Sequence, residues 1–274
     1  SEMCIRDSME AVEMYYTKNG LPWEDDPETK GIDPYAYNAE AGTANLHLYK
    51  EPRFYASVGY DRGTYEVDGK EIILYLRGDE LHGSTLKETD EYQSCTGYLC
   101  QKWIPKASTY NATSNSFSYY YYAYPYLRLP ELYLSYAEAD FEYNGSLSAQ
   151  SIEYINRVRE RCGLPTFQDS WALAGGIPTG QKLRKVLHQE RSIEFLFEGR
   201  RFHDLRRWKE AFEVMNKQPR SWNRDGKTAE EFYRVIEANQ GGRKRIFESP
   251  KSYWMAVPMS EINKNPNLVQ NPGY

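Results

Sequence analysis

The sequence predicts a mainly α-helical protein, in which tetratricopeptide-like helix pairs are accompanied by small β-hairpins and long loops. Three observations support this fold class. Apolar residues recur every three or four positions over most of the chain after residue 125. Before that point, short stretches alternate apolar and polar residues around an Asp-Gly dipeptide. Long intervening stretches are rich in Pro, Gly and polar residues, which is typical of loops.

The first half of the chain is predicted to be mostly loop with one helix end and a strand. Residues 9–16 carry apolar side chains at helical spacing and are followed by an Asn-Gly stop. Residues 20–50 contain repeated Pro and Gly and are predicted to be a long loop. Residues 53–60 alternate Phe, Ala, Val and Tyr on one face, and this alternation predicts a strand.

A β-hairpin is predicted next. Residues 64–67 and 71–76 flank the Asp-Gly at positions 68–69, a dipeptide that tolerates the positive φ of tight hairpin turns. Residues 98–104 are predicted to contain another short strand. The four consecutive tyrosines at 119–122 are expected to alternate between packing and surface.

An antiparallel helix pair is predicted between residues 125 and 163. Its first helix ends at Asn144-Gly145, where glycine suits a left-handed C-cap. Ser148 is positioned to cap the second helix, which Gly163 ends. Two helices within about 35 residues match one tetratricopeptide-type unit.

The strongest helical pattern follows this pair. It covers residues 183–197, is interrupted at Gly199, and continues to about residue 212. A further helix is predicted over residues 228–238. The tail beyond it is expected to be extended and rich in turns, with Trp254, like Trp208, in the core.

The amino-acid composition narrows the classes of function that the protein could have. With 34 basic and 39 acidic residues the net charge is −5, which argues against a nucleic-acid partner. The chain holds 25 Tyr and 6 Trp, residues that combine an apolar ring with a polar tip and often serve contact surfaces. No run of about 18 apolar residues exists to span a membrane. Of the four cysteines, Cys95 and Cys100 are open to either a local disulfide or two thiols.

Five blocks of sequence resemble the SusD/RagB family. They are YLRLPELYLSYAEA at 126–139, INRVRERCGLP at 155–165, ERSIEFLFEGRRFHDLRRW at 190–208, NPNLVQNPGY at 265–274 and PRFYA at 52–56. The four later blocks occur in the family's order, which makes the resemblance specific. Two positions depart from the family pattern, Glu where Asp is commoner before PRFYA and Cys where Ala is usual in the second block.

The resemblance implies a domain organisation. Residues 1–8 resemble a translated sequencing adaptor and are expected to be non-native. Residues 9–274 are expected to form the C-terminal domain of a longer family member. Within it we expect a loop- and hairpin-rich part at 9–124, a helical repeat part at 125–215, and a helix with an extended tail at 216–274.

The resemblance also implies a function. Family members of this kind are surface-exposed outer-membrane lipoproteins that bind glycans or, in some cases, peptides. They act with a SusC-like TonB-dependent transporter and do not catalyse. The implied lipid anchor is an N-terminal Cys that this sequence lacks. The partners expected here are therefore the transporter and an oligosaccharide ligand, without a cofactor.

Several charged residues have the spacing that a catalytic or metal site could use. Glu190, Glu194 and Glu198 lie four apart, and paired carboxylates can serve a glycosidase. Carboxylates along one helix are poorly placed to flank a glycosidic bond, so structural ion pairs between packed helices are expected instead. His188 and Glu190 point to different faces of a helix, and no metal site is predicted.

Loop aromatics are the predicted binding residues. Sugar rings present flat C–H faces that stack on Trp and Tyr, while polar neighbours bind the hydroxyls. Trp23, Tyr35, Tyr37 and Trp103 combine these features, and the ligand surface is predicted there. A helical-repeat scaffold that binds only proteins and a peptide-binding family member remain the alternative interpretations; a glycosidase is disfavoured.

Overall fold

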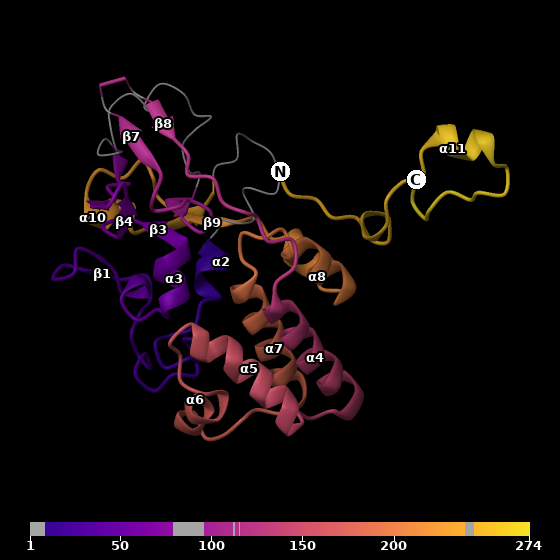
Figure 1. The fold of residues 1–274 in the computed structure, drawn as a ribbon, viewed down its shortest axis with the longest axis horizontal. Coiled ribbons are helices and arrows are strands. Elements are labelled where there is room, and N and C mark those ends of the chain that lie inside the picture. Colours follow the sequence, from indigo (N-terminus) through magenta and orange to yellow (C-terminus); the bar gives the residue numbers. More distant parts are fainter. Residues whose placement is uncertain (1–8, 79–95, 112, 115, 239–243) are drawn as a thin grey trace. The chain divides into compact units, whose positions relative to one another are not determined.

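The structure, a computed structural model, describes residues 9–78, 96–111, 113–114, 116–238 and 244–274 (Figure 1). The predicted fold class is confirmed, because the structure is mainly helical with short antiparallel strand pairs. Its α-helices within these ranges are α2 (Met9–Glu13), α3 (Pro52–Ser57), α4 (Leu129–Asn144), α5 (Ala149–Arg161), α6 (Phe167–Leu173), α7 (Gly180–Glu194), α8 (Arg201–Arg207), α9 (Ala211–Met215), α10 (Ala229–Phe232) and α11 (Met259–Lys264).

The described strands form two-stranded antiparallel ladders. The predicted hairpin at Asp68-Gly69 is confirmed, and both turn residues have positive φ, at 55° and 64°. The ladders pair β1 (Tyr37–Asn38) with β2 (Thr43–Ala44), β3 (Val58–Tyr60) with β6 (Tyr98–Cys100), β4 (Thr64–Val67) with β5 (Lys70–Ile73), β7 (Thr109–Asn111) with β8 (Ser116–Ser118), and β9 (Arg220–Trp222) with β10 (Val235–Glu237).

The chain divides into two compact units. The larger comprises residues 1–197 and 219–238, and the smaller comprises residues 198–218 and 239–274. The smaller unit has its own apolar cluster, built on Leu205, Ala211 and Phe247. Trp208 packs against that cluster, but Trp254 is 51% exposed, so its assignment to the core is wrong.

The helical layer of the larger unit is formed by α4, α5 and α7, with α6 beside α5 (Figure 1). The predicted caps are confirmed. Gly145 is left-handed with φ 72°, and its N–H donates to the carbonyl of Phe141. The Ser148 hydroxyl accepts from the Ser151 N–H at 3.3 Å and starts α5. The apolar stripes face one another in a core of Leu21, Leu134, Ala137, Phe141, Ile155, Val158, Phe167, Trp171, Leu183, Val186, Leu187 and Phe195.

Two predicted elements are wrong in type. Residues 53–60 form helix α3 followed by only three strand residues, because Pro52 at the first turn favours a helix start. The helix buries Arg53, Phe54 and Ser57 and leaves Tyr55 exposed. Residues 228–238 form a single helical turn, started by a capping box between Thr228 and Glu231. The β-branched residues after it pair with β9 instead.

Helix α6 and the β7–β8 hairpin are elements that the sequence pattern does not predict. Thr166 caps α6 by accepting from the Asp169 N–H at 3.1 Å, and Phe167 and Trp171 anchor it in the core. These anchors are two isolated aromatics in a polar stretch. The helical period was therefore too short to predict α6.

His47 lies at the centre of a second, aromatic core in the larger unit. Its ring lies 4.6 Å from the ring of Tyr60 and 5.9 Å from that of Trp222. Both ring nitrogens have partners, with Thr43 Oγ1 2.7 Å from Nδ1 and Tyr98 Oη 3.0 Å from Nε2. Burial, aided by the nearby Lys50 ammonium, lowers the pKa of His47 to about 3.

This lowered pKa predicts a loss of stability in acid. The unfolded chain binds a proton on His47 near pH 6.5, whereas the native protein does so only near pH 3. Between these values the unfolded state holds more protons, so the free energy of unfolding falls as the pH falls, by up to about 1.4 kcal/mol per unit. Urea unfolding of wild type and His47→Gln between pH 7 and pH 4 measures the difference. Identical pH slopes for both proteins would contradict it.

Candidate functional site

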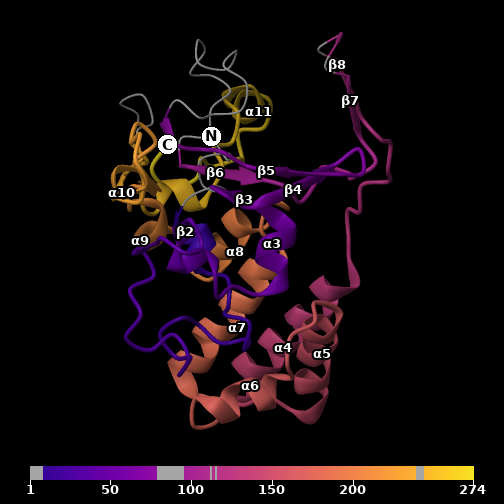
Figure 2. The same cartoon turned by 90° about the vertical axis from the view of Figure 1, so that its left-hand side faces the viewer.

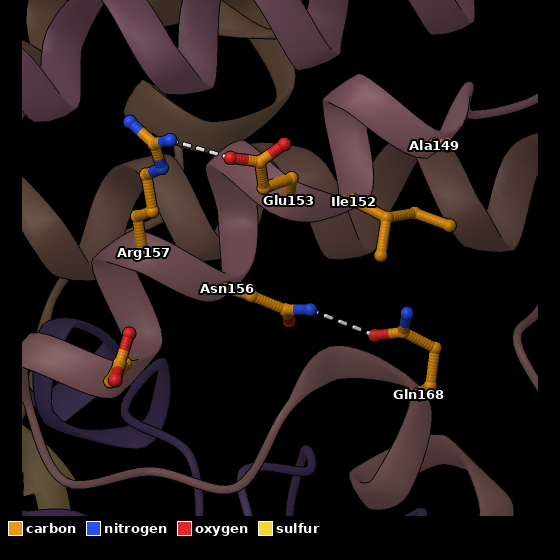
Figure 3. A pocket seen from close by; sticks show the side chains of 7 residues that line it. Ala149, Ile152, Glu153, Asn156, Arg157 and Gln168 are labelled. Atoms are coloured by element: carbon orange, nitrogen blue, oxygen red, sulfur yellow. Dashed lines mark hydrogen bonds and ion pairs between the residues drawn. The ribbon is translucent and has the colours of Figure 1, made fainter.

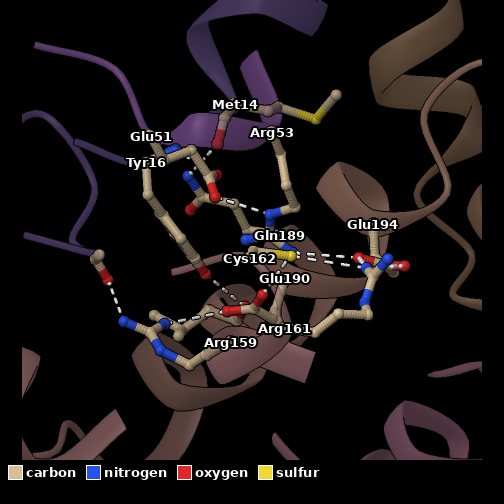
Figure 4. A network of polar contacts seen from close by, with 12 residues as sticks. Met14, Tyr16, Glu51, Arg53, Arg159, Arg161, Cys162, Gln189, Glu190 and Glu194 are labelled. Carbon is tan, nitrogen blue, oxygen red and sulfur yellow. Dashed lines mark hydrogen bonds and ion pairs between the residues drawn. The ribbon is translucent and has the colours of Figure 1, made fainter. Parts of the chain in front are cut away.

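The charged residues of α7 that resemble catalytic groups are buried in ion pairs. Glu190 Oε2 lies 3.0 Å from Arg159 Nη1 of α5, and Glu190 Oε1 lies 2.8 Å from Arg53 Nη1 of α3. Arg53 Nε also lies 2.6 Å from Oε2 of Glu51. Figure 4 shows these side chains converging from three elements that are distant in sequence. The expectation of structural ion pairs is confirmed for Glu190.

Arg159 is held on every side of its guanidinium. Its Nε donates to the carbonyl of Pro165 at 3.0 Å, and its Nη2 donates to the carbonyl of Gly20 at 2.8 Å and to Ser170 Oγ at 2.7 Å. The side chain is completely buried. One arginine thereby joins the first loop, α5, α6 and α7, and its charge is offset by Glu190.

Glu194 is shared among three arginines. Its carboxylate lies 2.8 Å from Arg128 Nη1 and 2.8 Å from Arg161 Nη2, and 3.4 Å from Arg53 Nη1. Burial alone would raise the pKa of Glu194, but the guanidiniums of Arg53, Arg161 and Arg128 outweigh it and lower the pKa. A carboxylate held ionised in this way is a poor general acid. Glu198, the third carboxylate of the series, lies beyond α7 in the smaller unit.

Few other described residues are candidates for catalysis or metal binding. Within the described residues no three His, Cys, Asp or Glu side chains gather closely enough to hold a metal ion. Cys162 is half-buried beside Arg161, whose Nη2 lies 3.5 Å from its sulfur. The proposed Cys95–Cys100 pairing lies outside the described residues, since Cys95 is not among them.

Trp23 is half-buried beside the first loop. Its ring meets Tyr49 edge to face at 5.8 Å, and the ammonium of Lys50 lies 5.9 Å from the ring centre. Lys50 itself is buried and donates to the carbonyl of Tyr15 at 2.7 Å. One edge of Trp23 is thus held by the protein while part of the ring stays accessible.

Tyr35 and Tyr37 are brought together at the aromatic core. Tyr35 meets the buried Trp222 edge to face at 6.2 Å, and its hydroxyl bonds to Glu13 and Arg220. Tyr37 stacks on Tyr233 at 5.5 Å with the rings 15° apart. Both side chains are half-buried. One face of Tyr37 and the polar tip of Tyr35 are therefore already engaged within the protein.

Trp103 is half-buried against the same core as Trp23, Tyr35 and Tyr37, and it also contacts a group of exposed tyrosines. Its indole N–H donates to the carbonyl of Phe197 at 2.7 Å, which fixes the ring. Tyr124 lies 4.7 Å from it, ring centre to ring centre, and Tyr126 meets Tyr124 edge to face at 5.9 Å. The Tyr122 hydroxyl donates to the Trp103 carbonyl at 3.1 Å.

The tyrosines before α4 are more exposed than the sequence suggests. The exposed fractions at 119–122 are 78%, 57%, 97% and 42%, so the expected alternation is present in degree, but none of the four side chains is buried. The segment runs as an extended trace from β8 to α4 (Figure 2), and within the described ranges it belongs to no strand ladder. It is joined to the rest of the larger unit by the Tyr122 hydroxyl on the Trp103 carbonyl and by the Tyr120 N–H on Ser108 Oγ.

A shallow hollow of about 450 Å³ lies between α5 and α6 (Figure 3). Asn156 Nδ2 donates to Gln168 Oε1 across it at 3.0 Å, and Asn156 Oδ1 accepts from the Phe167 N–H at 2.7 Å. Arg157 and Glu153 form an ion pair at its rim. These polar groups bond to one another and attach α6 to α5, so the hollow is explained by packing.

These features define a helical protein with small strand ladders, in which Glu190 and Glu194 of α7 form buried ion pairs and a group of tyrosines is exposed beside Trp103. The chain belongs to the SusD family, whose model matches residues 2–274. None of the helices in the described ranges has the length and apolarity needed to cross a membrane.

Individual relatives agree with the family assignment. The SusD-like protein P2 of Formosa agariphila is 28% identical over 150 residues, which cover 54% of this chain and 25% of that protein. The solved structure of BT4246 superposes with a TM-score of 0.83 at 29% identity, covering 97% of this chain and 46% of that one. A SusD-like carbohydrate-binding protein of Bacteroides fragilis, BF0978, has a TM-score of 0.63 at 25% identity, covering 96% and 48%. The chain therefore spans less than half the length of these relatives.

The buried ion pairs predict a large loss of stability when one partner is removed. Replacing Arg159 by Ala leaves Glu190 with less compensation in the core and should cost about 3–5 kcal/mol of unfolding free energy. Urea denaturation monitored by tryptophan fluorescence measures it.

Arg157→Ala is the matched control, since Arg157 lies on the same helix but pairs with Glu153 on the surface. It should leave the unfolding midpoint nearly unchanged, because exposed ion pairs contribute little. Equal shifts in the two variants would contradict the structural role given to Arg159.

Proposed function

We propose that this protein binds glycans at its exposed aromatic surface and does not cleave them. The single observation that carries the proposal is the group formed by Trp103, Tyr122, Tyr124 and Tyr126, which displays aromatic rings outward from a fixed tryptophan. Membership in the SusD family and the likeness to the carbohydrate-binding BF0978 support a sugar as the ligand.

The physical basis is stacking. A sugar ring offers an apolar C–H face that packs on an aromatic ring, and tyrosine hydroxyls can bond to the sugar hydroxyls. Trp103 is held by its own hydrogen bond to Phe197, so it loses little freedom on binding. The buried carboxylates of α7 are committed to arginines, which supports binding without hydrolysis.

The wider role follows from the family. We place the protein at the outer-membrane surface of a Bacteroidetes-type cell, as part of a lipid-anchored component. It would hand its oligosaccharide to a SusC-like TonB-dependent transporter. Recovery of a TonB-dependent transporter with the full-length protein from solubilised outer membranes tests this partner, and its absence under mild detergent would count against it.

Of the four residues predicted from the sequence, the proposal rests on Trp103. Trp23, Tyr35 and Tyr37 remain predictions, with Trp23 the more accessible to test, since Tyr35 and Tyr37 contact the aromatic core. Measuring Trp23→Ala in the gel-retardation assay described next decides whether a second part of the surface contributes to glycan binding.

Binding is tested by electrophoresis in gels that contain soluble starch, xylan, β-glucan, galactomannan or polygalacturonate. At least one polysaccharide should retard the protein, and Tyr126→Ala should weaken that retention about threefold to tenfold, the scale of one stacked ring. Incubation of the retained polysaccharide with the protein should release no reducing ends.

Tyr143→Ala is the control, because Tyr143 is 89% exposed on α4, like Tyr126 at 86%, but has no ring contact with the aromatic group. It should retain full binding. Equal losses in the two variants, or unaltered binding in Tyr126→Ala and Trp103→Phe together, would refute the assignment of the surface.

A further inference from the structure

The tyrosines before α4 form a regular row. Tyr120, Tyr122 and Tyr124 are two residues apart in the extended segment that joins β8 to α4, and Tyr126 follows them at the bend before α4 (Figure 2). Their exposed fractions are 57%, 42%, 49% and 86%. Alternate residues of an extended chain lie on one side, about 6.5–7 Å apart. We call these four residues the tyrosine row.

Contacts with Trp103 confirm that part of the row lies on one side. The Tyr122 hydroxyl bonds to the Trp103 carbonyl, the Tyr124 ring lies 4.7 Å from the indole, and Tyr126 lies against Tyr124. Had the segment been twisted by half a turn between Tyr122 and Tyr124, these two would not meet the same residue. Trp103 thus contacts two successive members of the row, and Tyr126 joins them through the Tyr124 ring.

The stretch of sequence that contains the tyrosine row lacks acidic residues. Residues 92–130 contain no Asp or Glu, although the first 130 residues carry 20 of them. The same stretch is rich in Ser, Thr, Asn and Tyr, which provide hydroxyl and amide groups. The carboxylates of other elements that reach this stretch, Glu66 beside Lys106 and Glu194 beside Arg128, are paired with basic side chains. The surface therefore offers hydrogen-bonding groups while these carboxylates are neutralised, and it suits a neutral or acidic polyhydroxylated chain.

The shape of the row indicates which part of such a chain it fits. Every member is exposed, so rings repeat along a line instead of closing around one point. A single sugar would contact one or two rings, whereas consecutive sugars of an unbranched chain contact several. An analogous arrangement of repeated stacking rings serves extended single strands of nucleic acid.

From this we propose that the tyrosine row binds the interior of a linear, neutral or acidic polysaccharide across several consecutive sugar units, without contacting a chain end. The proposal rests on the proposed function, since it names the kind of glycan that the same surface accepts. Affinity then grows with the number of sugar units until the row is covered, and it does not depend on the end of the chain.

Titration calorimetry with oligosaccharides of two, three, four and six units, cut from the polysaccharide that retards the protein, tests the proposal. Four units should bind at least about tenfold more tightly than two, because each additional stacked ring adds to the binding free energy. Borohydride reduction of the chain end should leave the affinity of the six-unit chain unchanged.

Two variants test whether the tyrosine row causes the dependence of affinity on chain length. Tyr126→Ala should reduce the gain from two to six units, while Tyr143→Ala should leave the whole series as in wild type. Equal affinity at all lengths, or loss of binding after end reduction, would overturn the row as an interior site while leaving glycan binding itself intact. If no polysaccharide in the gel panel retards the protein, the proposed function fails and this inference fails with it.

Discussion

The structure depends on one buried interaction, the bridge from Glu190 to Arg53 and Arg159. A charge in an apolar core is tolerated only when it is paired and hydrogen-bonded. Each partner comes from a different part of the chain, so the pairing brings α3, α5 and α7 together. Arg159 extends the same constraint to the first loop and α6 through Gly20 and Ser170. The helical layer and the loop-rich part are therefore fixed to one another through shared charges.

The buried ion pairs determine which side chains remain at the surface for binding. The carboxylates that most resemble catalytic groups are used inside the protein, where arginines keep Glu194 ionised. The aromatic core around His47 likewise takes up many of the tyrosines, including one face of Tyr37. The aromatic side chains that stay exposed include the tyrosines beside Trp103. Their rings lie at the end of the strand-rich part, just before α4 begins.

Much of the fold was predictable because local signals agreed with the final packing. The Gly145 and Ser148 caps and the Asp68-Gly69 turn each act within a few residues. The strand prediction for residues 53–60 was wrong because, over so few residues, a short helix can show the same alternation of apolar and polar side chains as a strand. The role of His47 was not predictable, since its partners come from positions up to 233 and no local pattern joins them. Trp103 was predicted, but the row beside it needed the structure, because four adjacent tyrosines hide a period of two.

The most direct test of the account is a crystal structure of the protein with a six-unit oligosaccharide of the polysaccharide that it retains. The account predicts consecutive sugar rings over Tyr122, Tyr124 and Tyr126, with the bridge from Glu190 to Arg53 and Arg159 unchanged. Sugar bound against the carboxylates of α7, or in the hollow between α5 and α6 with the tyrosines bare, would contradict it.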